Sequence, residues 1–204
     1  MAPTPALIAA CITCLLVAGC TSSTPSTPAS SSSPAVSAST PASPSPSPAS
    51  STPTWSTDQS AAVVAVDEYR AAIHRIESNP ADFSKAEMTA ILKRVAGGNV
   101  ITANVASYLD LKKRGFRYDG DTAVVSTKVS KPSKASYGAE VVVTRCIDQR
   151  ALRVLDKGGA EVSSAKLGYT VPDFNLRQYT VVRPQGSKQF LVYGLAPAKG
   201  DCGP

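Results

Sequence analysis

The chain has 204 residues, of which 43% are hydrophobic and 6% aromatic, and its 21 Lys and Arg outnumber its 15 Asp and Glu. All of these charges lie at or after Asp58, at the density of an ordinary globular protein, whereas the preceding residues carry none. The composition excludes collagen, a coiled coil, a polytopic membrane protein and a miniprotein held by disulfides alone. The length leaves room for one globular domain of about 150 residues.

Residues 1–19 have the pattern of an export signal. Leu7 to Gly19 form an apolar run of 13 residues, which is shorter than the roughly 20 residues needed to span a bilayer and typical of the core of a signal peptide. The run ends in Val17-Ala18-Gly19-Cys20, which resembles the bacterial lipobox. The resemblance implies that Cys20 receives a diacylglyceryl thioether, with acyl chains such as palmitate, and becomes the first residue after cleavage.

Such a modification predicts a protein anchored by lipid to the extracytoplasmic face of the bacterial cell membrane, because two acyl chains are enough for stable membrane association. No Lys or Arg precedes the apolar run, so an ordinary cleaved signal followed by an unmodified Cys20 is the alternative. Cys11 and Cys14 lie inside the segment that would be removed. We therefore interpret them as apolar filler and not as a redox or metal pair.

Residues 20–57 are predicted to form a disordered stalk. Between residues 21 and 54 the chain contains 14 Ser, 8 Pro, 6 Thr, 5 Ala and one Val, a composition that cannot build a core and that proline holds extended. At about 3.1 Å per residue the stalk would reach on the order of 100 Å. Either O-glycosylation or an unmodified spacer is compatible with this composition.

The domain predicted for residues 58–204 opens with three segments whose apolar residues recur at helical spacing. The predicted helices cover residues 58–78, 85–96 and 100–114. Asp58 is predicted to cap the first helix, Ser84 and Glu87 form a capping box for the second, and Gly115 is predicted to end the third in a left-handed conformation. The side chains predicted to face inward are Ala62, Val66, Tyr69, Ile73, Ile76, Met88, Ile91, Leu92, Val95, Val105, Tyr108 and Leu109.

After Gly115 the apolar period changes to two, which indicates strands. The predicted strands cover residues 116–118, 123–129, 140–147, 152–155, 176–183 and 189–195. Turn-forming residues at 156–159 and 184–186 separate neighbouring strands. Helices followed by a run of antiparallel strands predict an α+β fold.

Cys146 and Cys202 are the two thiols that remain in the domain if the other cysteines belong to the signal segment. In an exported domain such a pair is expected to form a disulfide, with two free thiols as the alternative. The bond would close a loop of about 57 residues, contribute up to roughly 4 kcal/mol, and hold the C-terminal strand to the sheet.

The three helices, the segments Val141–Asp148 and Tyr179–Val182, and the terminal Gly200-Asp201-Cys202 resemble a group of actinobacterial secreted proteins and lipoproteins of unknown function. Those proteins are similar to the nuclear-transport-factor-2-like fold. The resemblance covers about residues 60–204 and implies three helices packed in a curved antiparallel sheet that forms a cone. Many relatives carry Trp where this chain has Phe190, a replacement that keeps an aromatic side chain there. The resemblance implies no particular activity.

Residues suited to catalysis are sparse. His74, the only histidine, lies one turn from Arg70 and Glu77 on the first helix, and is either a surface residue or a general base in a cone-shaped pocket. Asp110 and Asp119 are the carboxylates considered for an isomerase or cyclase reaction, but Asp110 is expected to face solvent and Asp119 to lie in a turn. Metal-ligand clusters, nucleophile motifs and phosphate-binding loops are absent from the sequence, so we predict no catalytic residue, metal or cofactor.

Basic residues concentrate at 112–117, 128–134 and 145–153. We interpret them as a solvated surface, with contact to anionic lipid or wall polymer as the alternative. Nucleic-acid binding is not expected of an exported domain without interleaved aromatic residues.

The sequence therefore favours a non-catalytic binding or accessory domain of the cell envelope with a protein, lipid or wall partner. The alternative is a small isomerase- or cyclase-type enzyme. The two hypotheses differ in the pocket they require: an apolar or collapsed pocket argues against the enzyme, and a buried carboxyl group of raised pKa opposite a tyrosine favours it.

Overall fold

A computed structural model describes residues 54–202 of the chain. The predicted signal peptide, with Cys11 and Cys14, the lipidation site Cys20 and nearly all of the predicted stalk lie outside the described residues. Among residues 54–202, no helix is both long enough and apolar enough to cross a membrane.

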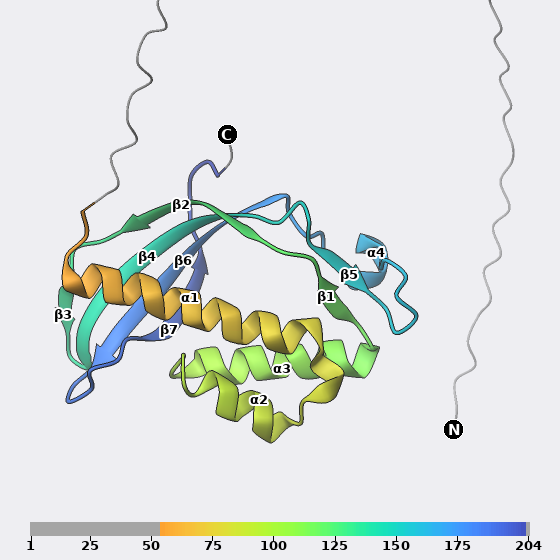
Figure 1. Cartoon of the computed structure of the whole chain (residues 1–204), viewed down its shortest axis with the longest axis horizontal. Coiled ribbons are helices and arrows are strands. Elements are labelled where there is room, and N and C mark those ends of the chain that lie inside the picture. The colour runs from red at the N-terminus through yellow and green to blue at the C-terminus, as the bar shows by residue number, and fades with distance from the viewer. Residues whose placement is uncertain (1–53, 203–204) are drawn as a thin grey trace, which may run out of the picture. The chain divides into compact units, whose positions relative to one another are not determined.

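Helices and antiparallel strands make up the described domain, which confirms the predicted α+β class (Figure 1). The helical elements are α1 (Thr57–Ser78), η1 (Pro80–Asp82), α2 (Lys85–Leu92), α3 (Asn99–Arg114) and α4 (Ser164–Leu167). The strands are β1 (Arg117–Asp119), β2 (Ala123–Val129), β3 (Ser133–Ala135), β4 (Gly138–Asp148), β5 (Arg153–Leu155), β6 (Phe174–Pro184) and β7 (Leu191–Pro197).

The first helix begins earlier than predicted, and Asp58 is not its cap. The hydroxyl of Ser56 accepts a hydrogen bond from the Gln59 backbone at 3.4 Å, and the Gln59 side chain accepts one from the Ser56 backbone at 2.9 Å. This capping box supplies partners for the backbone amides of Ser56 and Gln59, which have none within the helix. The Asp58 carboxylate instead pairs with Arg183 of β6 at 2.8 Å.

The second helix ends at Leu92, four residues before the predicted end. The chain that follows it runs along the edge of the sheet, where Val192 of β7 exchanges backbone hydrogen bonds with Val95 and Gly97, both at 3.0 Å. A Cβ atom at Gly97 would come within 2.3 Å of the Tyr193 ring, so glycine permits this close approach without moving the ring. The third helix matches its prediction within one residue, and Gly115 has the predicted left-handed conformation, with φ of 69°.

Five strands form one antiparallel sheet in the order β2-β4-β6-β7, with β3 also paired to β4, and β1 pairs with β5 in a separate two-stranded sheet. All six predicted strands are present, with ends shifted by up to two residues. Strand β3 and helix α4 were not predicted: they have three and four residues, and β3 has no buried residue that would mark an inward face.

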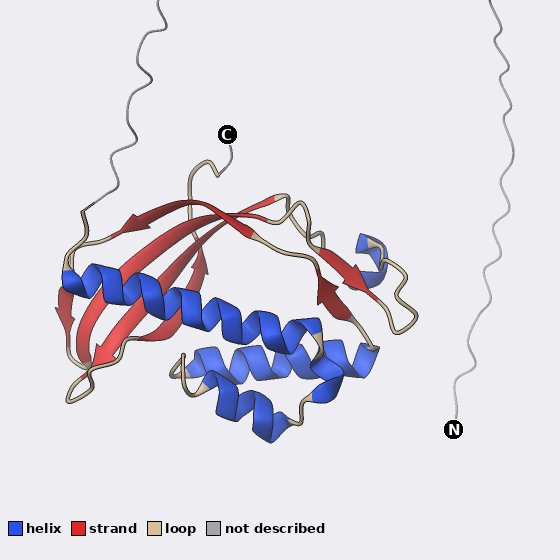
Figure 2. Ribbon diagram, in the orientation of Figure 1, coloured by secondary structure: helices blue, strands red, loops and turns tan. Residues whose placement is uncertain are grey.

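The longer helices α1, α2 and α3 lie on one side of the five-stranded sheet, which bends over α1 (Figure 2). Strand β4 turns Val141, Val143, Arg145 and Ile147 towards α1, since alternate residues of a strand share a face. The core includes Val66, Tyr69, Ile76, Met88, Leu92, Val105, Tyr108, Val181, Phe190 and Val192. Of the side chains predicted to face inward, Ile73, Ile91, Val95 and Leu109 are only half-buried and pack against this core.

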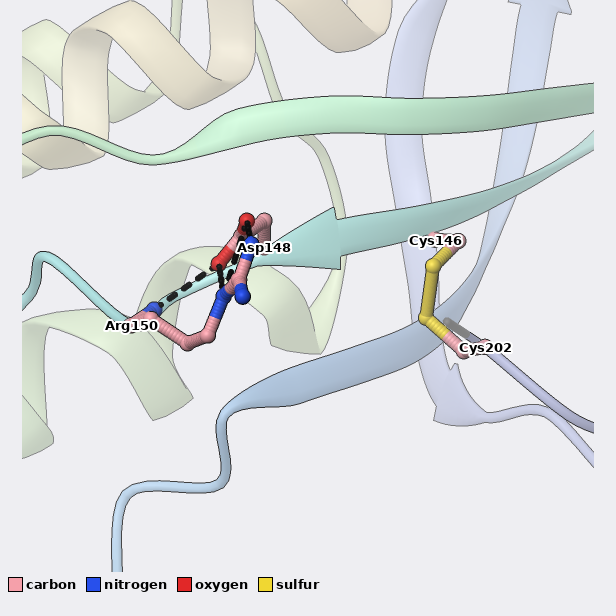
Figure 3. Close-up of a disulfide and its surroundings, with 4 residues drawn as sticks. All are labelled: Cys146, Asp148, Arg150 and Cys202. Carbon is pink, nitrogen blue, oxygen red and sulfur yellow. Dashed lines mark hydrogen bonds and ion pairs between the residues drawn. A yellow bond between two sulfur atoms is a disulfide. The ribbon is translucent and has the colours of Figure 1, made fainter. Parts of the chain in front are cut away.

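The predicted disulfide between Cys146 and Cys202 is confirmed, with 5.3 Å between the two Cα atoms (Figure 3). Cys146 lies on the face of β4 opposite to Arg145, so the bond is on the side of the sheet away from α1. The chain leaving β7 is therefore held against the outer face of the sheet.

Candidate functional site

A cavity of about 430 Å³ lies between the C-terminal half of α1 and the neighbouring ends of β4 and β6. Tyr118 of β1 and the loop at Asp121 and Thr122 close a third side. Its volume falls within the range of pockets that bind small molecules, roughly 300–1,000 Å³.

Four polar residues on α1 form a stripe that faces the sheet. Asp67, Arg70, His74 and Glu77 are three, four and three positions apart, which places them on one side of a helix. Asp67 contacts Arg145 of β4, while Arg70, His74 and Glu77 line the cavity. His74 is exposed, as predicted for a surface residue, but the surface it occupies is that of the cavity.

Two acidic residues line the cavity, the exposed Asp121 and the half-buried Glu77. Glu77 keeps part of its own surface exposed, yet protein atoms surround it closely, and this burial raises its pKa. The positive charges of His74, Arg70 and Arg177 act in the opposite direction without cancelling the effect. Among residues 54–202, Glu77 has no hydrogen-bond partner that would stabilise its ionised form.

Buried phenol groups surround this carboxyl. Burial raises the pKa values of Tyr108 and Tyr118 well above the ordinary value, and the charge of Glu77 raises both further. Burial also raises the pKa of Tyr69 to about 12, although the side chain of Asn104 donates a hydrogen bond to its oxygen at 2.8 Å. These phenols stay protonated at neutral pH and can act as hydrogen-bond donors.

Three arginines of the cavity, Arg70, Arg75 and Arg177, lack a carboxylate partner within the described part of the chain. Arg70 donates to the neutral hydroxyls of Tyr179, at 3.3 Å, and Thr122, at 2.6 Å. Arg177 of β6 is exposed within the cavity and lies directly opposite Arg145 in the β4–β6 register. Within the described residues, the cavity thus holds three guanidinium groups that no carboxylate neutralises at ion-pair distance, and one of them, that of Arg75, lies over the Phe83 ring.

Arg145 is buried, so the prediction of a basic surface over residues 145–153 is wrong at this residue. Its side chain is 3% exposed and donates to Asp67 at 2.5 Å, while its Nε atom has no hydrogen-bond partner. The inner-facing register of β4 buries it. Arg150 does lie on the surface, but it pairs with Asp148 at 2.6 Å and holds the pKa of that carboxyl at about 2 (Figure 3).

The other two candidate carboxylates lie outside the cavity. Asp110 is exposed, as predicted, and pairs with Arg114 at 3.5 Å. Asp119 is exposed at the end of β1 and precedes the turn residue Gly120. Across residues 54–202, no group of three or more His, Cys, Asp and Glu side chains is arranged to hold a metal ion.

Glu77 was not predicted to be a site residue, although its helical spacing from Arg70 and His74 can be read from the sequence. Arg70, His74 and Glu77 lie on the same helical side as the half-buried Ile73, so a polar stripe bordered an apolar one. That pattern alone does not show whether the stripe faces solvent or a cavity.

Comparisons with known proteins leave the function open. No protein-family model matches the chain, and no curated protein matches it. It is similar to the crystal structure of the intermembrane space region of chloroplast protein ARC6, with 12% identity and a TM-score of 0.48 over 71% of this chain and 99% of that one. It is also similar to a de novo designed β-sheet protein, with 14% identity and a TM-score of 0.30 over 70% of this chain and 90% of that one. Similarities this distant support no statement about activity.

Proposed function

We propose that residues 58–204 form a binding domain of the nuclear-transport-factor-2-like type, which holds a small molecule in the cavity beside α1. The observation that carries this proposal is the cavity itself, where charged groups converge on apolar walls, as in ligand pockets. Ile73, Ile147 and Leu152 supply the apolar part, and Arg70 and Arg177 the charged part.

We further propose that this domain is tethered by lipid on Cys20 to the extracytoplasmic face of a bacterial membrane. The lipobox resemblance and the charge-free, Ser- and Pro-rich stalk support this placement. The disulfide between Cys146 and Cys202 suits an oxidising compartment.

The position of the cavity on α1 agrees with a tether at the start of the domain. The described chain enters at the N-terminal end of α1, and Tyr69, the first cavity residue of the helix, lies about 18 Å further along its axis. The remaining α1 residues of the cavity lie still further from that end. A ligand would enter away from the point of attachment.

A variant that fills the cavity tests the binding proposal. We expect native mass spectrometry of the full chain, extracted from its own envelope, to show a small-molecule adduct that Ile73→Trp removes. Val64→Trp is the matched control, because Val64 lies on the same helix with 54% of its surface exposed. Circular dichroism checks that both variants fold. An adduct that survives in Ile73→Trp, or a wild type without any adduct, contradicts the proposal.

One observation favours acid–base catalysis as a second candidate function. Glu77, a carboxyl group of raised pKa, and Tyr118 line the same cavity, which comes near the arrangement that distinguishes the enzyme hypothesis, although the Tyr118 hydroxyl pairs with that of Tyr169 at 2.6 Å. In that case Glu77, and neither Asp110 nor Asp119, would transfer the proton. Glu77→Gln should lower turnover by about 10² to 10⁴ while leaving ligand binding in place. A wild type that turns over no substrate in isomerase and hydrolase panels argues against this candidate.

A further inference from the structure

We infer that the ligand of this cavity is a small organic oxyanion, a carboxylate or phosphate ester with an apolar body, whose anionic head binds between Arg70 and Arg177. The inference rests on the proposed function and adds the chemical class of the ligand.

The positive charge of the cavity is not balanced by ion pairs within the described residues. Five arginines of the described domain lie within 4 Å of a carboxylate oxygen, namely Arg114, Arg145, Arg150, Arg153 and Arg183. Arg70 and Arg177 do not, although Glu77 and Asp121 also line the cavity. Arg75, the remaining arginine of the lining, lies over the Phe83 ring with its guanidinium carbon 5.5 Å from the centroid.

The position of one of the two cations is fixed. Hydrogen bonds to Tyr179 and Thr122 hold the Arg70 guanidinium in place before any ligand arrives. Arg177 lies opposite Arg145 in the β4–β6 register, and Asp67 already pairs with Arg145. Arg70 and Arg177 both line the same cavity. An oxyanion placed there relieves their repulsion and accepts charge-assisted hydrogen bonds.

The cavity also has an apolar wall. Ile73 is half-buried and borders the same cavity beside the more deeply buried Ile147 and Leu152, so its free surface would stay in contact with water if the ligand were inorganic phosphate or sulfate. A ligand with an apolar body covers that surface. A volume of about 430 Å³ restricts that body to small-molecule size and excludes a folded polymer.

Glu77 does not oppose an anion as strongly as its position suggests, because its burial favours the neutral acid. The titratable and charged groups around it are Tyr69, Arg70 and His74 from α1, Tyr108 from α3, Tyr118 from β1 and Arg177 from β6. The phenols among them are protonated, so none adds negative charge near the anionic head.

Isothermal titration calorimetry on the full chain can test the ligand class with three probes that share a ring. Benzoate and phenyl phosphate carry the two kinds of oxyanion, and benzyl alcohol is their neutral counterpart. We expect at least one anion to bind at least tenfold more tightly than benzyl alcohol, and the stronger of the two identifies the head group. Arg177→Gln should weaken that anion at least tenfold and leave benzyl alcohol unchanged.

Arg94→Gln is the control for net charge, because Arg94 is exposed near the end of α2 and does not line the cavity. Equal loss of binding in Arg94→Gln and Arg177→Gln overturns the inference, as does the absence of binding by either anion. If benzyl alcohol binds as tightly as both anions and Ile73→Trp abolishes its binding, the proposed binding function stands and the inference of an oxyanion ligand is wrong. If Ile73→Trp changes neither probe binding nor the native adduct, the binding function itself fails.

Discussion

Glu77 is a residue whose ionisation should lower the stability of the fold. Because burial raises its pKa, the folded protein holds the proton more tightly than the unfolded chain does. The resulting stabilisation is complete below the unfolded pKa, near about 4.3, and is lost as the pH rises through the folded pKa. We expect Glu77→Gln to melt at a higher temperature than the wild type at pH 8 and at the same temperature at pH 3.

Thermal melts of Glu87→Gln provide a control of opposite sign. Hydrogen bonds from the side chain and backbone of Ser84 lower the pKa of Glu87, so its ionised form stabilises the folded state above the unfolded pKa. Glu87→Gln should therefore lower the melting temperature at pH 8. A Glu77→Gln variant that also melts lower at pH 8 would show that the Glu77 carboxylate is stabilised by the fold, contrary to our account.

The buried Arg145 depends on Asp67 for neutralisation. Asp67→Ala leaves a guanidinium of 3% exposure without its anion, and we expect it to lower the free energy of unfolding by about 2–3 kcal/mol. Adding Arg145→Met to that variant should restore part of the loss, because the buried charge is then absent. Asp110→Ala, which breaks the exposed pair with Arg114, should cost less than about 1 kcal/mol. Urea unfolding measures the free energy of unfolding of all three variants. Equal losses of stability in Asp67→Ala and Asp110→Ala would contradict the dependence of Arg145 on Asp67.

At the scale of elements, local patterns predicted most of the secondary structure. Apolar spacing located α1 and α3, and the capping box of Ser84 and Glu87 is present at the start of α2. The errors lie where tertiary contacts compete with local preference. Pairing with Val192 of β7 draws the chain after Leu92 out of the helix, and a salt bridge to Arg183 occupies Asp58.

The disulfide joins two elements that no backbone hydrogen bond holds together, β4 and the segment after β7. Its two cysteines are 56 positions apart, so the bond removes conformational freedom from a long segment of the unfolded chain. We expect Cys202→Ala to lower the free energy of unfolding by about 2–4 kcal/mol in urea. Cys146→Ala/Cys202→Ala should behave the same way. A non-reducing peptide map that finds both thiols free in the native protein would disprove the bond.

At the scale of the whole molecule, the proposed tether predicts where the chain begins after processing. Labelling of bacteria with a clickable fatty acid should mark the wild type and fail to mark Cys20→Ala. Cys14→Ala should keep the label, because Cys14 lies in the segment that processing would remove. Equal labelling of Cys20→Ala and the wild type would exclude lipidation at this position.

The sequence by itself determined the α+β order of elements and the pairing of Cys146 with Cys202. Helix caps and apolar periods act over a few neighbouring residues, and a disulfide needs only two thiols and an oxidising compartment. Tertiary structure alone decided the cavity. Glu77 and Arg177 lie far apart in the chain, and neither has a local pattern that marks it as a ligand-binding residue. The bend of the sheet over α1 brings them together, because burial and charge neutralisation depend on which elements meet in space.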